Sequence, residues 1–299
     1  MDNNTSMTAL VSLFARAYHT KRSAAPVYED ELAELLMTKE EYEKVALSME
    51  SGASFFFPNF SGTPQEALDK IVNTRLAPAV VSRSAFCLDA LRNAVMLGAK
   101  QLVLLGSGYD SLPYRAEFYG KLNTFELDRE EMIKDKIRRL EEGKIEHAKV
   151  SFIPCDLSAD FENGLISAGF KNDERTFVCA LGLCHYLNKE EFSALLKKIA
   201  SLVPAHSEVL FDYPLKTADG ESTVQKLASG AGEQMKADYS FSELERLLQE
   251  SGFLIYENLS KKETDERFFA PHNAFTDGTG LMEAPGDFAL CRAVLSKKV

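Results

Sequence analysis

The sequence predicts an α/β fold, a mostly parallel sheet with helices on both faces, preceded by a helical segment. Three observations support this. From residue 101 onward, short apolar runs alternate with segments of helical length. The first run stops at a Gly-x-Gly turn formed by Gly106 and Gly108, where the absence of Cβ atoms lets a ligand approach the backbone. Before residue 98, apolar side chains recur at helical spacing.

The elements follow from these patterns in chain order. Helices are expected over about 6–50, where Thr38-Lys-Glu-Glu41 resembles a capping box, and over about 65–97, which ends at Gly98. The expected strands are 101–105, 122–127, 149–154, 176–181, 207–212, 253–257 and 288–295. The later helices are expected at about 112–119, 129–142, 158–168, 189–203 and 240–251. Seven strands therefore follow a largely helical segment.

These elements form one compact unit with two regions. Residues 1–98 are expected to be a helical lid packed on the core, and residues 99–299 the α/β domain. Two stretches, 213–239 and 258–287, interrupt that domain as insertions, and their length suggests functional loops. In an open α/β sheet, ligands bind beyond the carboxyl ends of the strands, so the site is expected at that edge.

Composition narrows the class of protein. The net charge of -11 and pI of about 5.1 argue against nucleic acid as a partner, since a phosphate backbone requires a basic face. The five cysteines are scattered, which is typical of buried thiols in a reducing compartment, and the histidines lack metal-ligand spacing. No apolar run reaches the roughly 18 residues of a membrane span, and the polar N-terminus does not resemble a signal peptide. The expected location is cytoplasmic, without a metal.

The glycine turn indicates the kind of ligand. A dinucleotide fingerprint has a third glycine, but Leu112 occupies that position, so the turn suits a nucleoside without a pyrophosphate. About twenty residues after the turn, Phe125-Glu-Leu-Asp128 ends a second strand with acids that can accept ribose hydroxyls. S-adenosylmethionine (SAM) is the favoured ligand. A dinucleotide, as in an NAD-dependent dehydrogenase, and a fold without a cofactor are the alternatives.

With the elements placed, the chain resembles the leucine carboxyl methyltransferase family of SAM-dependent methyltransferases, in its bacterial O-methyltransferase branch. The matching segments are Ser82-Arg-Ser-Ala-Phe-Cys-Leu-Asp89, Gln101-Leu-Val-Leu-Leu-Gly-Ser-Gly-Tyr-Asp-Ser-Leu-Pro-Tyr-Arg115, Phe125-Glu-Leu-Asp128, Pro154-Cys-Asp-Leu157 and Leu181-Gly-Leu-Cys-His-Tyr-Leu187. The resemblance implies a class I methyltransferase (Rossmann-like) fold, whose seven-stranded sheet has an antiparallel last strand. It also implies SAM as methyl donor and S-adenosylhomocysteine as product.

The resemblance also implies roles for individual residues. Arg83 would hold the SAM carboxylate, because a guanidinium binds a carboxylate through two bonds. The turn Gly106-Ser107-Gly108 would lie under the methionine and ribose, with Glu126 and Leu127 at the ribose. Asp156 and Leu157 would address the adenine. Asp110 is expected to orient the loop through backbone N–H groups, with direct SAM contact as the alternative.

One position departs from the family pattern. Relatives usually have Glu-Gly where this chain has Leu181-Gly182, so one acceptor for the SAM ammonium group is missing. The backbone carbonyls of Gly106 and Leu181 are expected to take over that contact. The departure puts a protein C-terminal leucine in doubt as substrate.

The acceptor side is less clearly marked. His185, just after the fourth strand, is a candidate general base, and Tyr213 follows the fifth strand as a second catalytic candidate. Tyr18 and His19, on the N-terminal helix, are candidate substrate contacts. The expected reaction is O-methylation of a small-molecule hydroxyl or carboxylate. The alternatives are methylation of a protein C-terminal carboxylate, expected to need an open groove, and a non-catalytic SAM-binding module.

Overall fold

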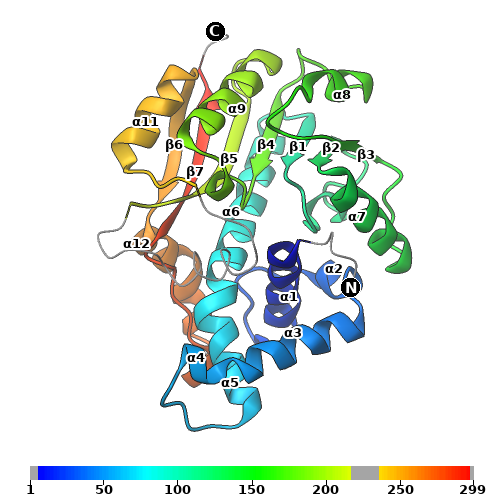
Figure 1. Cartoon of the computed structure of the whole chain (residues 1–299). Helices are drawn as coiled ribbons and strands as arrows, with labels where there is room; N and C mark the ends of the chain where they lie inside the picture. The colour runs from blue at the N-terminus through cyan, green and yellow to red at the C-terminus, as the bar shows by residue number, and fades with distance from the viewer. Residues whose placement is uncertain (1–5, 217–235, 297–299) are drawn as a thin grey trace.

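A seven-stranded sheet forms the centre of the molecule (Figure 1). The computed structural model describes residues 6–216 and 236–296. The strands are β1 Gln101–Leu105, β2 Asn123–Asp128, β3 Val150–Pro154, β4 Thr176–Ala180, β5 Glu208–Pro214, β6 Phe253–Leu259 and β7 Phe288–Leu295. Their order is β3-β2-β1-β4-β5-β7-β6. Only β7 runs antiparallel to its neighbours, β5 and β6, which confirms the predicted class I methyltransferase topology.

The central strands are buried on both faces, which is why they read as continuous apolar runs. In β1, Leu102 and Leu104 point into one apolar cluster, whereas Val103 and Leu105 point into the other. The first cluster also contains side chains of the N-terminal helices, so this helical segment and one face of the sheet share a core.

Helices cover both faces of the sheet. The helices that follow the strands are α7 Glu130–Glu142, α8 Glu162–Ser167, α9 Lys189–Leu202 and α11 Phe241–Glu250. Side chains of α6 and α7 join the cluster that contains Leu104, and those of α8, α9 and α11 join the cluster on the opposite face. Among the described residues, no helix is long and apolar enough to cross a membrane.

Most of the N-terminal helices gather at the bottom of Figure 1, and the last of them, α6, runs upward from there along the sheet. They are α1 Met7–Arg22, α2 Glu31–Leu35, α3 Lys39–Ser51, α4 Ala53–Phe56, α5 Pro64–Ile71 and α6 Ala77–Met96, the last two joined by the π-helical turn Val72–Leu76. Thr38 and Glu41 form the predicted capping box of α3. Gly98, at φ 96°, follows the end of α6 as predicted.

The helix expected at 112–119 does not form. The structure has a single 3₁₀ turn there, Leu112–Tyr114, followed by irregular backbone. The reason lies in its side chains. Ser111 donates a hydrogen bond to Asp30, and Tyr114 donates one to Glu126, both in buried positions. These two bonds hold the side chains of Ser111 and Tyr114 in directions that a regular helix would not allow.

The two insertions differ in how much of them the structure describes. The segment expected as a loop at 258–287 contains short helices, α12 Lys261–Thr264 and α13 Ala270–Asn273, joined by a π-helical turn. Of the insertion at 213–239, residues 217–235 lie outside the described part of the chain. The described ends of this insertion meet in a bridge between Leu215 and Tyr239.

One glycine lets the N-terminal helices approach α7 closely. A Cβ atom on Gly143 would lie 2.5 Å from the carbonyl oxygen of Leu35 at the end of α2. Real Cβ atoms do not come this close to a carbonyl oxygen, so an alanine would push α2 away from α7.

We therefore expect Gly143→Ala to lower the free energy of unfolding by about 1–3 kcal/mol, the usual range for overpacking. Gly286→Ala is the matched control, because a Cβ there meets nothing within 4 Å. Urea unfolding of both variants measures the difference. Equal stabilities for the two variants would contradict the contact.

Candidate functional site

The glycine turn lies directly after β1. Gly106 and Gly108 have φ of 64° and 46°, a left-handed conformation in which any L side chain would be strained. The amides of Gly106 and Ser107 donate to the Leu127 carbonyl at 2.9 and 3.2 Å. The side chain of Asp110 accepts from the Leu112 amide at 2.9 Å, the loop-orienting contact that we expected. The turn is thus held at the sheet edge with no side chain at Gly106 or Gly108 and with Ser107 buried between them.

The two acids of β2 have different surroundings. Glu126 is fully buried, where Lys136 pairs with its carboxylate and Tyr114 donates to it at 2.6 Å. Asp128, at the strand end, accepts from the Gly108 amide at 2.8 Å. The ribose role predicted for Glu126 does not fit its burial, whereas Asp128 lies at the open end of the strand beside the glycine turn.

The alternation of side chains along a strand could have revealed this difference between Glu126 and Asp128. Residues 126 and 128 face the same side of β2, but only the second lies at the open end of the strand. The side chain of Leu127 is buried in the opposite apolar cluster, so its contribution to the turn comes from its carbonyl.

Asp156 and Leu157 follow β3, the neighbour of β2, at the same edge of the sheet. One carboxylate oxygen of Asp156 accepts from the Ser158 amide at 2.9 Å and from the Ser158 hydroxyl at 2.7 Å. These bonds lower the pKa of the exposed Asp156 carboxyl. Leu157 is half-buried. Both residues lie just beyond the end of β3, at the same edge of the sheet as the glycine turn.

A third group of residues lies after β4, around the buried carboxylate of Asp212. Gly182 donates its amide to Asp212 at 2.5 Å, and Arg83 reaches the same carboxylate from α6 at 3.2 Å. Gly182, at φ 67°, leaves room for that guanidinium, since a Cβ there would lie 3.0 Å from Arg83 Nη1. Leu181, immediately before this turn, is half-buried at the edge of the core.

His185 completes this group. Its Nε2 lies 3.0 Å from Asp212 Oδ2, and its Nδ1 is buried with no hydrogen-bond partner among the residues that the structure describes. Burial alone would raise the pKa of Asp212, but the charge of Arg83 and the bonds from His185 and Gly182 hold it well below its usual range. A Cβ on Gly106 would touch Leu183 at 3.4 Å, so the glycine turn lies beside this group.

Sequence reasoning did not single out Asp212. The sequence feature that could have identified it is a carboxylate inside the apolar strand β5, because a buried charge needs partners. Tyr213, the next residue, points to the opposite face, is fully buried, and donates to Asn258 at 2.9 Å. The catalytic role predicted for Tyr213 does not fit that position.

The two residues predicted to contact substrate are also part of the core. Tyr18 is buried, and its hydroxyl bonds to Asp69 and Gln65. His19 is buried too, and its Nε2 accepts from the Val27 amide at 2.9 Å. Burial, together with the nearby His272, lowers the pKa of His19 to about 4. Both side chains stabilise the lid, and neither fits the predicted role.

Helix α1 nevertheless lies close to the glycine turn. A Cβ on Gly108 would lie 3.8 Å from the Cβ of Ala9. Arg16 donates to the Tyr109 carbonyl at 2.7 Å and to Asp30 at 2.8 Å. These contacts of Arg16 are buried, so α1 is bonded to the loop at Tyr109 and packs beside Gly108.

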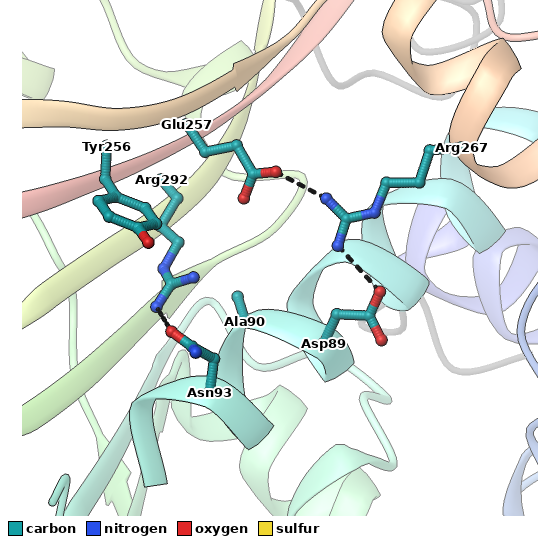
Figure 2. Close-up of a pocket in the computed structure, with 7 residues that line it drawn as sticks. All are labelled: Asp89, Ala90, Asn93, Tyr256, Glu257, Arg267 and Arg292. Carbon is teal, nitrogen blue, oxygen red and sulfur yellow. Dashed lines mark hydrogen bonds and ion pairs between the residues drawn. The ribbon is translucent and has the colours of Figure 1, made fainter. Parts of the chain in front are cut away.

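A separate hollow of about 390 Å³ lies between α6 and the β6–β7 edge of the sheet (Figure 2). Its charged walls neutralise one another. Arg267 pairs with Asp89 and Glu257, and Arg292 bonds to Asn93 and pairs with Glu208. In the described part of the chain, no cluster of three or more His, Cys, Asp or Glu side chains is suited to a metal ion, here or elsewhere.

Comparison with known proteins places this geometry in a family. A model of the leucine carboxyl methyltransferase family matches residues 9–200. The protein YktD of Bacillus subtilis, described as a SAM-dependent methyltransferase, is 33% identical over 287 residues, covering 90% of this chain and 92% of its own. A Mycobacterium leprae protein of the same description is 26% identical over 209 residues, covering 70% and 67%.

Solved structures give a fold-level likeness. Magnesium protoporphyrin IX methyltransferase of Synechocystis, crystallised with S-adenosylhomocysteine, has a TM-score of 0.49 and 16% identity, covering 84% of this chain and 98% of its own. SAM is the methyl donor of the relatives that match in sequence. Since the family model spans most of the chain and YktD matches nearly all of it, this protein belongs to the leucine carboxyl methyltransferase family of SAM-dependent methyltransferases.

Proposed function

We propose that this chain transfers the methyl group of SAM to an oxygen atom of a small molecule. The observation that carries the proposal is the lid, because α1 is bonded to the glycine loop through buried Arg16. A lid closed in this way favours an acceptor that can be enclosed. A protein tail would require an open groove, and the family glutamate is also absent at Leu181.

The residues at the edge of the sheet fit SAM. The turn at Gly106 and Gly108 is a cradle without side chains, and the Asp128 carboxylate beside it is suited to ribose hydroxyls. Arg83 is only partly exposed, and it uses Nη1 on Asp212, which leaves Nη2 for the SAM carboxylate. Asp156 and Leu157 lie one strand further, at the adenine end. The carbonyls of Gly106 and Leu181 are proposed to hold the SAM ammonium group.

SAM supplies a methyl group that its sulfonium already activates, so the protein mainly aligns and encloses the reactants. Closure by α1 excludes water, and this protects the sulfonium from hydrolysis. The proposed setting is cytoplasmic, in line with the scattered thiols of the chain. A non-catalytic SAM-binding module remains the second candidate, and turnover separates the two.

The cofactor assignment is tested by calorimetric titration with SAM and S-adenosylhomocysteine. Gly106→Val and Asp128→Asn are each expected to lower the affinity for both ligands about 10-fold to 100-fold. The valine would fill the space of the glycine turn, and the asparagine would remove the carboxylate acceptor. Asp156→Asn is expected to have a smaller effect, because Asp156 is exposed and keeps its Ser158 contacts. Unchanged affinity in Asp128→Asn would contradict the ribose assignment.

The acceptor class is tested with methyl-labelled SAM and two kinds of acceptor. We expect label on small aromatic hydroxyl or carboxyl compounds and none on a ten-residue peptide that ends in leucine. Efficient labelling of the peptide would favour the protein carboxyl methyltransferase. Tight SAM binding without turnover on either kind would favour the binding module.

The lid is tested by removing its buried charge pair. Asp30→Asn leaves the Arg16 guanidinium, which is 8% exposed, without its anion, and breaking such a pair typically costs about 3–5 kcal/mol. Hydrogen exchange in α1 is expected to rise, and SAM affinity to fall. The control is Glu34→Gln, which removes an ion pair with Lys21 that is more than half exposed. Equal exchange in the two variants would show that the pair does not hold the lid.

A further inference from the structure

We propose that His185 is the general base for a hydroxyl acceptor and that Asp212 is the positioning residue that fixes its tautomer. The inference rests on the proposed function and narrows its acceptor from hydroxyl or carboxylate to hydroxyl. It starts from two atoms of one ring. Nε2 faces the Asp212 carboxylate at 3.0 Å, whereas Nδ1 is buried with no partner in the described part of the chain.

The carboxylate decides which nitrogen carries the proton. A carboxylate accepts hydrogen bonds, so Nε2 must be the N–H nitrogen of the neutral ring, and Nδ1 then keeps its lone pair. Asp212 stays ionised because Arg83 and the Gly182 amide bind the same carboxylate. Buried polar atoms normally have partners, so the lone pair of Nδ1 is left for a donor that the free protein lacks.

A hydroxyl acceptor supplies that donor. The acceptor O–H gives its proton to His185 Nδ1 while its oxygen forms a bond to the methyl carbon. The methyl–sulfur bond of SAM breaks, and its electron pair stays on sulfur, which becomes a neutral thioether. The products are a methyl ether, S-adenosylhomocysteine and an imidazolium that is stabilised by Asp212 and later loses its proton to water.

A carboxylate acceptor does not suit the same geometry. It is already ionised, so it has no proton to offer Nδ1, and two lone pairs would face each other. Its charge would also come near the buried anion of Asp212, whose nearby cation, Arg83, is already engaged. The pair of His185 and Asp212 would then serve no purpose in the reaction.

The surroundings hold His185 in place from several elements. Asp212 faces it from β5, and Arg83 shares that carboxylate from α6. The Lys236 amide donates to the His185 carbonyl at 2.9 Å, and Lys236 Nζ pairs with Glu191. The glycine turn lies beside Leu183, two residues before His185, since a Cβ on Gly106 would be 3.4 Å from the Leu183 side chain.

The decisive measurement is NMR of the full chain labelled with ¹⁵N-histidine, with and without SAM, between pH 6 and 9. We expect the neutral Nε2–H tautomer at His185 in the wild type and loss of that preference in Asp212→Asn. An Nδ1–H tautomer, or a ring that stays doubly protonated through this range, would overturn the proposal. The measurement needs no acceptor, so its result does not depend on which compounds the protein can methylate.

Kinetics test the role of the ring with two compounds that share one skeleton, 2-naphthol and 2-naphthoic acid. In His185→Gln the amide can still donate to Asp212, but no base remains, so kcat on the naphthol is expected to fall about 10²-fold to 10⁴-fold. The rate of the variant on 2-naphthoic acid, which needs no base, is expected to match the wild-type rate on that compound. His147→Gln, whose ring bonds within its own loop, is the control.

The outcomes separate this inference from the proposed function. Methylation of 2-naphthol by His185→Gln at the wild-type rate, or faster methylation of 2-naphthoic acid than of 2-naphthol by the wild-type chain, would refute this inference while supporting an O-methyltransferase. Failure of SAM to bind the wild-type chain would refute the proposed function itself.

Discussion

The carboxylate of Asp212 is the interaction on which the functional end of the molecule depends. It accepts bonds from the turn after β4, from α6 and from the 3₁₀ turn that carries His185. An isolated charge at this depth would be very unfavourable, and removing one partner of a buried ion pair usually destabilises a protein strongly. The three partners therefore stabilise the anion, and the anion fixes the relative positions of the residues proposed to hold SAM and the acceptor.

The loop after β1 has two halves with separate tasks. The first half, Gly106 to Gly108, has side chains at neither glycine, keeps Ser107 buried and is bonded to the end of β2. In the second half, Ser111 and Tyr114 direct their hydroxyls to buried carboxylates of the lid and of β2. The loop after β1 thus forms the proposed SAM site and also bonds to the lid. A shift of the lid is therefore expected to change the shape of that site.

Most of the fold could be predicted from the sequence because its strands are buried on both faces. All seven strands agree with the apolar runs, and the antiparallel last strand agrees with what the family resemblance implied. The helix expected at 112–119 failed because tertiary bonds of Ser111 and Tyr114 outweigh local preference. Asp212 was missed because its guanidinium partner is 129 residues away in the chain, and no local pattern reports such a contact. Glu126 was preferred over Asp128 because spacing alone does not show which acid is covered by Lys136.

The lid comes first in the chain, and this order matters for folding. The inner face of α1, with Leu13, Phe14 and Ala15 fully buried, packs in the cluster that also holds Leu290 of β7. During synthesis this apolar helix leaves the ribosome well before the strands that complete its core. Such non-local packing is slow and exposes apolar surface in the meantime. Helix α1 is therefore made before the strands that complete its core, and its apolar face stays exposed until β7 has been made.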